Sequence, residues 1–262
     1  MSEGYVVFVD DDPTYLELVD VLIESVLSFS TRPIELFSIN HDFRHSSSRV
    51  LSRRVDIEPR RRTSGIGLSR RRARRKYFAG VCYTKLLCSL NSSFTYGIQL
   101  DSDFIITREM DTLFEEARSV GTTPLGSLHP ADPCNQQALM TYLGVETKSQ
   151  PYVHATYLFS SETRPFFAEC HDVAMTLLRN GVYPGNLDET VLNVMLWKRE
   201  SRRWATCYDP YFEVFLNRDS FHDHGYGWME SINYYSCHGI KDPARARAVL
   251  EELIRGDEEG RS

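Results

Sequence analysis

Residues 5–40, "YVVFVDDDPTYLELVDVLIESVLSFSTRPIELFSIN", decide the fold. The stretch opens with a short apolar run at 5–10 that ends in acids, which is typical of a buried parallel strand. A helix is predicted next, because helix-start residues surround Pro13 and apolar residues recur at helical spacing. These apolar residues are Leu16, Val19, Leu22, Ile23, Val26 and Leu27. A second apolar run at 33–40 completes a β-α-β unit, which predicts a parallel sheet with a right-handed crossover.

The rest of the chain continues this alternation, so we predict one α/β domain over residues 1–262, with a mostly parallel central sheet flanked by helices. Further helices are predicted at 77–90, 109–120, 162–181, 188–200 and 242–256, and Gly181 is a helix stop signal. Further strands are predicted at 96–100, 123–128, 152–161, 205–215 and 232–239. The tail at 257–262 is predicted to be frayed.

A basic segment at about 44–76 interrupts the pattern. It holds thirteen basic residues against two acids, which leaves +11, whereas the rest of the chain carries −17. Its glycines and serines predict a mobile loop instead of a helix with a defined apolar face. The segment either binds an anionic partner or is a solvated loop that balances an acidic body. The absence of interleaved aromatic residues in the arginine run disfavours a nucleic-acid-binding module.

The sequence has no apolar run near the 18–20 residues or so that a membrane span needs, and therefore no predicted transmembrane segment. Its first residues, "MSEGYVVFVDDDP", lack the basic region and the length of apolar run that a signal peptide has. We therefore expect a cytoplasmic protein.

Two acids separated by one serine, Asp101 and Asp103, follow the apolar run "YGIQL" at 96–100. Ligands of open α/β sheets bind beyond the carboxyl ends of the strands, which is where these carboxylates are expected to lie. Paired oxygen donors suit a hard divalent cation, Mg²⁺ or Mn²⁺, whose other ligands are water and phosphate. The alternative is that one acid caps the next segment and the other is solvated.

Four segments, in order, resemble the nucleotide-sugar-dependent glycosyltransferases with the glycosyltransferase A fold, in the style of glycogenin and the lipopolysaccharide galactosyltransferases. They are "VVFVDDDPTYLELVDVLIESVLSF" at 6–29, "GIQLDSDFIITREMDTLF" at 97–114, "NLDETVLNVMLW" at 186–197 and "CHGIKD" at 237–242. The third segment has Asp-Glu where the glycogenin-like pattern has Asp-Gln-Asp, and the arginine-rich stretch is foreign to the pattern. The acceptor and the choice between retention and inversion therefore stay open.

The resemblance implies a single glycosyltransferase A-type, Rossmann-like domain. Residues 1–104 would form the nucleotide-sugar-binding half, with the basic loop, and residues 105–262 the acceptor-binding half. It also implies a hexosyltransferase-type enzyme that moves a sugar from a nucleoside diphosphate sugar, a UDP-sugar, to a hydroxyl group of a glycan, protein or small molecule. The alternative is a non-catalytic or nucleotidyltransferase-like sugar-nucleotide-binding protein whose arginine-rich loop binds an anionic partner.

The resemblance assigns the metal ion, Mn²⁺ or Mg²⁺, to Asp101, Asp103 and His238. It assigns the donor to Val9, Asp10, Asp11, Tyr15, Lys85, Asp101, Ser102, Gly239 and Lys241. Chemistry agrees with these assignments, because a lysine neutralises a phosphate as a point charge and glycine lets the backbone approach it closely. The structural alternatives stay open, with His238 an ordinary histidine, Lys85 a solvated helix lysine and Asp11 a helix-start acid.

The catalytic candidates are Asp188, Glu189 and His154. A carboxylate on the acceptor side could take the proton of the acceptor hydroxyl or stabilise an oxocarbenium-like transition state. Asp188 and Glu189 begin a predicted helix, whose backbone NH groups favour an ionised acid. The alternative is that both acids only cap that helix. His154 could form a hydrogen bond with the sugar.

Overall fold

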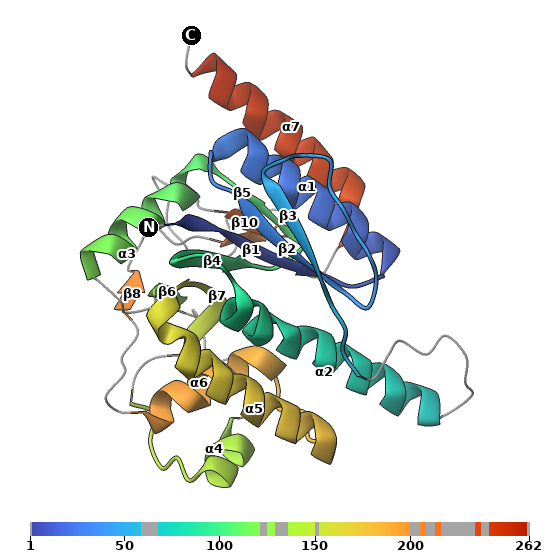
Figure 1. The fold of residues 1–262 in the computed structure, drawn as a ribbon, viewed down its shortest axis with the longest axis vertical. Helices are drawn as coiled ribbons and strands as arrows, with labels where there is room; N and C mark the ends of the chain where they lie inside the picture. Colours follow the sequence, from blue (N-terminus) through green and yellow to red (C-terminus); the bar gives the residue numbers. More distant parts are fainter. Residues whose placement is uncertain are drawn as a thin grey trace.

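The computed structural model describes residues 2–58, 68–120, 125–128, 136–149, 152–199, 205–207, 213–215, 234–236 and 241–260. Figure 1 shows the arrangement of its helices and strands. In chain order the elements are β1 (Glu3–Val9), α1 (Pro13–Phe29), β2 (Ile34–Ile39), β3 (Val50–Val55), α2 (Leu68–Asn91), β4 (Tyr96–Leu100), β5 (Phe104–Ile106), the 3₁₀ helix η1 (Arg108–Asp111), α3 (Thr112–Val120), β6 (Leu125–Leu128), α4 (Gln137–Leu143), β7 (Val153–Ser160), the 3₁₀ helix η2 (Ser161–Thr163), α5 (Arg164–Asn180), α6 (Leu187–Lys198), β8 (Ala205–Cys207), β9 (Glu213–Phe215), β10 (Tyr234–Ser236) and α7 (Pro243–Glu259).

The main sheet has seven strands in the order β3-β2-β1-β4-β7-β6-β8. The first four are parallel to one another, β7 is antiparallel to both of its neighbours, and β6 is parallel to β8. The predicted β-α-β unit and the mostly parallel sheet are confirmed. A second sheet has the order β5-β10-β9. The predicted late strand at 205–215 corresponds to two separate strands, β8 in the main sheet and β9 in the second.

Helices cover both faces of the main sheet, with α1 and α7 on one side and α2, α5 and α6 on the other (Figure 1). Alternate residues of β1 divide between the two resulting cores. Val6 and Phe8 belong to the core with α2, α5 and α6, and Val7 and Val9 to the core with α1 and α3. Burial on both faces explains why β1 is a continuous apolar run. None of the helices in the described ranges combines the length and apolar character that crossing a membrane takes.

The helices α1 and α7 begin in the same way and pack against each other. Each has an aspartate N-cap followed directly by proline, and the Asp12 carboxylate accepts a hydrogen bond from the Thr14 NH over 3.1 Å. Apolar residues of the two helices form a small buried cluster with Ile105 of β5. An ion pair between Arg247 and Glu24, 2.6 Å apart, joins the helices at its edge. The N-terminal and C-terminal helices therefore form one layer.

The predicted basic loop and frayed tail are wrong over much of their length. Strand β3 lies within the basic segment, where Arg53 pairs over 2.8 Å with the buried Glu35 of the neighbouring strand. Helix α2 begins at Leu68, because arginine is a good helix former and a helix anchored by packing is extended at little cost. Helix α7 continues to Glu259, and an ion pair between Asp257 and Arg108 holds its last turns.

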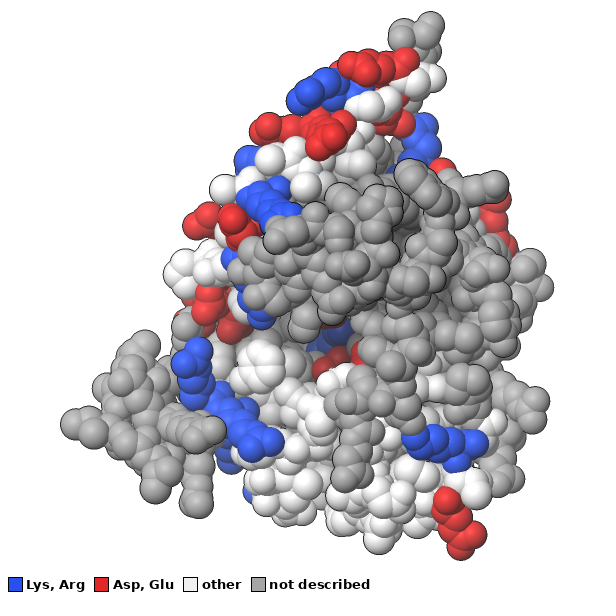
Figure 2. Space-filling view, turned by 180° about the vertical axis from the view of Figure 1, so that it is seen from behind, with Lys and Arg blue, Asp and Glu red and all other residues white. Residues whose placement is uncertain are grey.

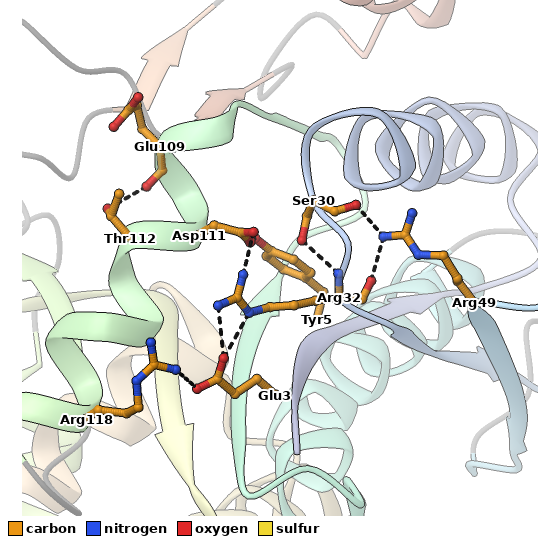
Figure 3. Close-up of polar contacts among 9 residues, drawn as sticks. All are labelled: Glu3, Tyr5, Ser30, Arg32, Arg49, Glu109, Asp111, Thr112 and Arg118. Atoms are coloured by element: carbon orange, nitrogen blue, oxygen red, sulfur yellow. Dashed lines mark hydrogen bonds and ion pairs between the residues drawn. The ribbon is translucent and has the colours of Figure 1, made fainter. Parts of the chain in front are cut away.

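A charged network joins three elements at the amino end of β1, as Figure 3 shows. Arg32, which precedes β2, pairs with Glu3 of β1 and with Asp111 of η1. The Tyr5 hydroxyl donates a hydrogen bond to Asp111 over 2.5 Å. Arg118 of α3 also pairs with Glu3. The network fixes the start of β1 at the end of the sheet opposite to the acids that follow β1 and β4.

Candidate functional site

A cavity of about 180 Å³ lies at the carboxyl ends of β1 and β4. These neighbouring parallel strands are where the strand order reverses, since the chain proceeds from β1 to β2 on one side and β4 lies on the other. Figure 2 shows a recess near the centre of one face, with acidic and basic side chains at its bottom. The lining residues are Phe8, Val9, Asp10, Tyr15, Phe78, Val81, Cys82, Lys85, Asp101, Ser102, Asp103, Asp188 and Lys241.

Lys85 of α2 is the central cation of the cavity. Its Nζ lies 2.6 Å from Asp101 Oδ1 and 3.5 Å from Asp188 Oδ2, and only 4% of its side chain is exposed. Burial would lower the pKa of this ammonium group, but the two carboxylates outweigh burial and raise the pKa above its ordinary value. Lys85 is therefore charged and joins an acid from β4 to an acid from α6, so it is not a solvated helix lysine.

Asp188 lies in the first turn of α6, directly after a strained residue. Leu187 has a φ of 44°, a left-handed conformation that is costly for a residue with a branched side chain. Burial raises the pKa of Asp188 to about 6, even though Lys85 acts in the opposite direction. The helix start alone would favour the ionised acid, and desolvation outweighs this effect. Asp188 can therefore take up and release a proton near neutral pH.

Another wall of the cavity is formed by Asp10, Tyr15 and Lys241. The Tyr77 hydroxyl donates to Asp10 over 3.1 Å, and burial raises the pKa of the Asp10 carboxyl. Lys241 has a φ of 50°, and its Nζ lies 4.2 Å from the centroid of the Tyr15 ring. Partial burial lowers the pKa of Lys241, although Asp12 and Asp10 act against this. This wall therefore offers an acid, an aromatic face and a cation to a ligand.

The donor atoms that could hold a metal ion are the carboxylates of Asp101 and Asp103. Both line the cavity, and Ser102 between them lines it too. Two carboxylates fit the oxygen preference of Mg²⁺ or Mn²⁺, which keep several water or phosphate ligands. Among the described residues no three His, Cys, Asp or Glu side chains form a metal-binding group. The predicted third ligand, His238, and the neighbouring Gly239 lie outside the described residues.

Three predicted site residues do not line the cavity. Asp11 accepts a hydrogen bond from the Tyr77 hydroxyl over 3.3 Å. Glu189 accepts one from the Asn186 amide over 2.9 Å, and it is buried. His154 lies in β7, where its Nδ1 accepts from a backbone NH. The structure thus brings Asp188 to the cavity without Glu189 or His154, and their proposed roles in catalysis receive no support from this cavity.

Sequence reasoning missed the apolar wall, which consists of Phe8 and three residues of α2, Phe78, Val81 and Cys82. The sequence could have indicated the α2 part of this wall, because these residues recur at helical spacing with Lys85 and so lie on the same face of the helix. Tyr77 was also missed, since its bond to Asp10 joins segments more than sixty residues apart.

The sequence matches no family model and no curated protein at a significant level. Among solved structures, the chain is similar to galactosyltransferase LgtC, whose structure is a complex with donor and acceptor sugar analogues. The TM-score is 0.59, the identity is 14%, and the match covers 97% of this chain and 95% of LgtC. The chain therefore has the glycosyltransferase A fold over nearly its whole length, as the sequence predicted.

Proposed function

We propose that this protein is a metal-dependent glycosyltransferase that moves a sugar from a UDP-sugar to a hydroxyl group of a glycan, protein or small molecule. The observation that carries the proposal is the cluster of Asp101, Lys85 and Asp188 in a cavity at the reversal of strand order. Ligands of open α/β sheets bind at such reversals. The full-length similarity to LgtC adds fold-level support, since that protein was solved with donor and acceptor sugar analogues.

In the proposed donor complex, each wall of the cavity has a separate task. Tyr15 and Asp10 bind the base and the ribose through an aromatic face and a carboxylate. Lys241 neutralises the pyrophosphate. Its ammonium group would have to move off the Tyr15 ring, which would free Lys241 for the phosphates and Tyr15 for the base. Asp101 and Asp103 would hold Mn²⁺ or Mg²⁺, which stabilises the charge that develops on the leaving pyrophosphate.

Asp188 is the residue proposed to act on the acceptor side. Its ionised form can accept the proton of the acceptor hydroxyl, and a pKa of about 6 is close to that of an effective general base at neutral pH. Lys85 orients this carboxylate through the 3.5 Å contact and holds Asp101 at the same time. The two acids are thus fixed relative to each other by one buried cation.

The proposal is tested by the thermal stability of the protein with UDP, with and without Mn²⁺. A ligand that binds only the native state raises the free energy of unfolding by RT ln(1 + [L]/Kd). We therefore expect UDP to raise the melting temperature only when the metal is present. The Asp103→Asn variant should lose this shift while remaining folded, and the exposed Asp42→Asn should keep it as a matched control. An undiminished Mn²⁺-dependent shift in Asp103→Asn would remove Asp103 from the metal site.

A screen of donor hydrolysis across nucleotide sugars identifies the donor. Hydrolysis of a UDP-sugar that depends on Mn²⁺ is the expected result. Binding of UDP without hydrolysis of any nucleotide sugar, and without transfer to any acceptor in a glycan panel, would favour the non-catalytic alternative.

A further inference from the structure

One face of α2 leads out of the cavity. Lys85, Cys82 and Phe78 line the cavity and are spaced by three or four residues, so they form a row along the helix. The same spacing places Arg74 next in the row, roughly 6 Å beyond Phe78 along the helix axis. Figure 2 shows basic side chains on the same face of the molecule as the recess. The wall of the cavity that α2 forms thus continues into a basic surface.

Phe78 stands at the mouth of the cavity. It lines the cavity and yet 52% of the residue is exposed to solvent. Within the described part of the chain, only Tyr142 is a more exposed large apolar residue. An exposed aromatic ring beside a polar site offers a flat surface against which a ligand ring can pack.

Arg74, Arg75 and Lys76 are the described basic residues that precede Phe78 in α2. Arg74 and Arg75 are exposed, and within the described ranges neither they nor Lys76 form an ion pair. The Arg75 guanidinium lies 5.1 Å from the centroid of the Tyr183 ring. Tyr183 belongs to the connection between α5 and α6 that leads to Asp188. The basic surface is therefore joined to the segment that carries the acceptor-side acid.

We propose that the acceptor is an anionic saccharide, whose ring packs on Phe78 and whose phosphate or carboxylate group is bound by Arg74 and Arg75. This inference rests on the proposed function, because it names the class of acceptor for the same site. An anion is attracted here, since Arg74, Arg75 and Lys76 are three successive basic residues of α2 within a chain of net charge −6. The row along α2 would direct the acceptor hydroxyl from Phe78 inward, toward Asp188.

The test is isothermal calorimetry with the full chain in the presence of UDP and Mg²⁺. Trehalose 6-phosphate is compared with trehalose for the phosphate group, and glucuronate with glucose for the carboxylate group. We expect tighter binding of at least one anionic probe than of its neutral counterpart, and a smaller difference at high salt. A preference in one pair only identifies the anionic group as phosphate or carboxylate.

The double substitution Arg74→Gln and Arg75→Gln retains helix-forming side chains and should weaken binding of the anionic probe by roughly three- to thirtyfold. Binding of UDP and of the neutral sugar should not change. Phe78→Ala should weaken the anionic and the neutral sugar alike. Arg255→Gln, an exposed arginine of α7, is the matched control and should keep the preference.

Two results overturn the inference and leave the proposed function intact. One is equal affinity for the anionic and neutral sugars in both pairs, and the other is a preference that persists in the double variant, with UDP bound in both cases. If UDP itself does not bind the wild-type protein, the proposed function and the inference are both overturned.

Discussion

Replacement of Asp188 by asparagine should stabilise the protein while it slows transfer. An exposed aspartate has a pKa of about 3.9, and burial raises that of Asp188 to about 6 in the folded protein. The folded protein therefore holds this proton roughly a hundredfold more tightly than the unfolded chain does. This tighter proton binding adds about 3 kcal/mol to the free energy of unfolding below about pH 4. The contribution is lost as the pH rises through 6. Asparagine cannot ionise, so the variant avoids that loss.

The assay is urea unfolding of the wild type and of Asp188→Asn between pH 4 and pH 8. The free energies of unfolding should be similar at pH 4 and should differ by about 3 kcal/mol at pH 7.5, which corresponds to about 5 °C in Tm. The exposed Asp42→Asn should show no comparable rise with pH. A variant less stable than the wild type at pH 7.5 would refute the reasoning, because attraction to Lys85 would then outweigh burial. Transfer should fall by about 10²–10⁴-fold in the same variant, and in the wild type it should fall as the pH drops below 6.

Three further predictions concern stability and are measured by urea unfolding. Gly97→Ala should cost roughly 1–3 kcal/mol, because the added Cβ would lie 2.3 Å from the Phe159 ring; an unchanged midpoint would contradict this packing. Gly256→Ala, in α7 with open space around it, should instead stabilise the protein by roughly 0.5–1 kcal/mol, and a loss would show that the helix is not formed there. Arg32→Ala should cost roughly 1–3 kcal/mol, because Glu3 and Asp111 lose the cation that they share; an unchanged midpoint would rule out the charged network as a source of stability.

Elements that show one clear pattern of apolar residues along the chain could be predicted from the sequence. The run at 5–10 and the helix after it correspond to β1 and α1, and the acids that end the strands, Asp10 and Asp101, do line the cavity. These predictions succeed because strand ends in a parallel sheet share one edge, so a local pattern fixes a long-range position.

Other parts depend on contacts that no local pattern contains. The segment around Lys85 has the same pattern whether the lysine faces solvent or meets two acids, and only the packing of α2 against β4 and α6 brings Asp101 and Asp188 to it. The start of α2 was missed because glycines and a run of like charges suggest a loop, while the packed second half of the helix supports its first turns. Phe78 was missed because an apolar residue on a predicted helix is expected to be in the core.

The position of Lys241 has a consequence for the order in which the site is completed during synthesis. All the other lining residues lie at or before Asp188 in the chain, so the ribosome has made every acid of the cavity lining before Lys241 is added. Lys241 directly precedes the Asp242 cap of α7, and α7 is held on α1, the helix that carries Tyr15. The nascent domain can therefore form most of its sheet early, but the full set of charges that line the cavity exists only once α7 has docked. If the cavity binds UDP as proposed, binding of UDP by the nascent chain would report that α7 has docked.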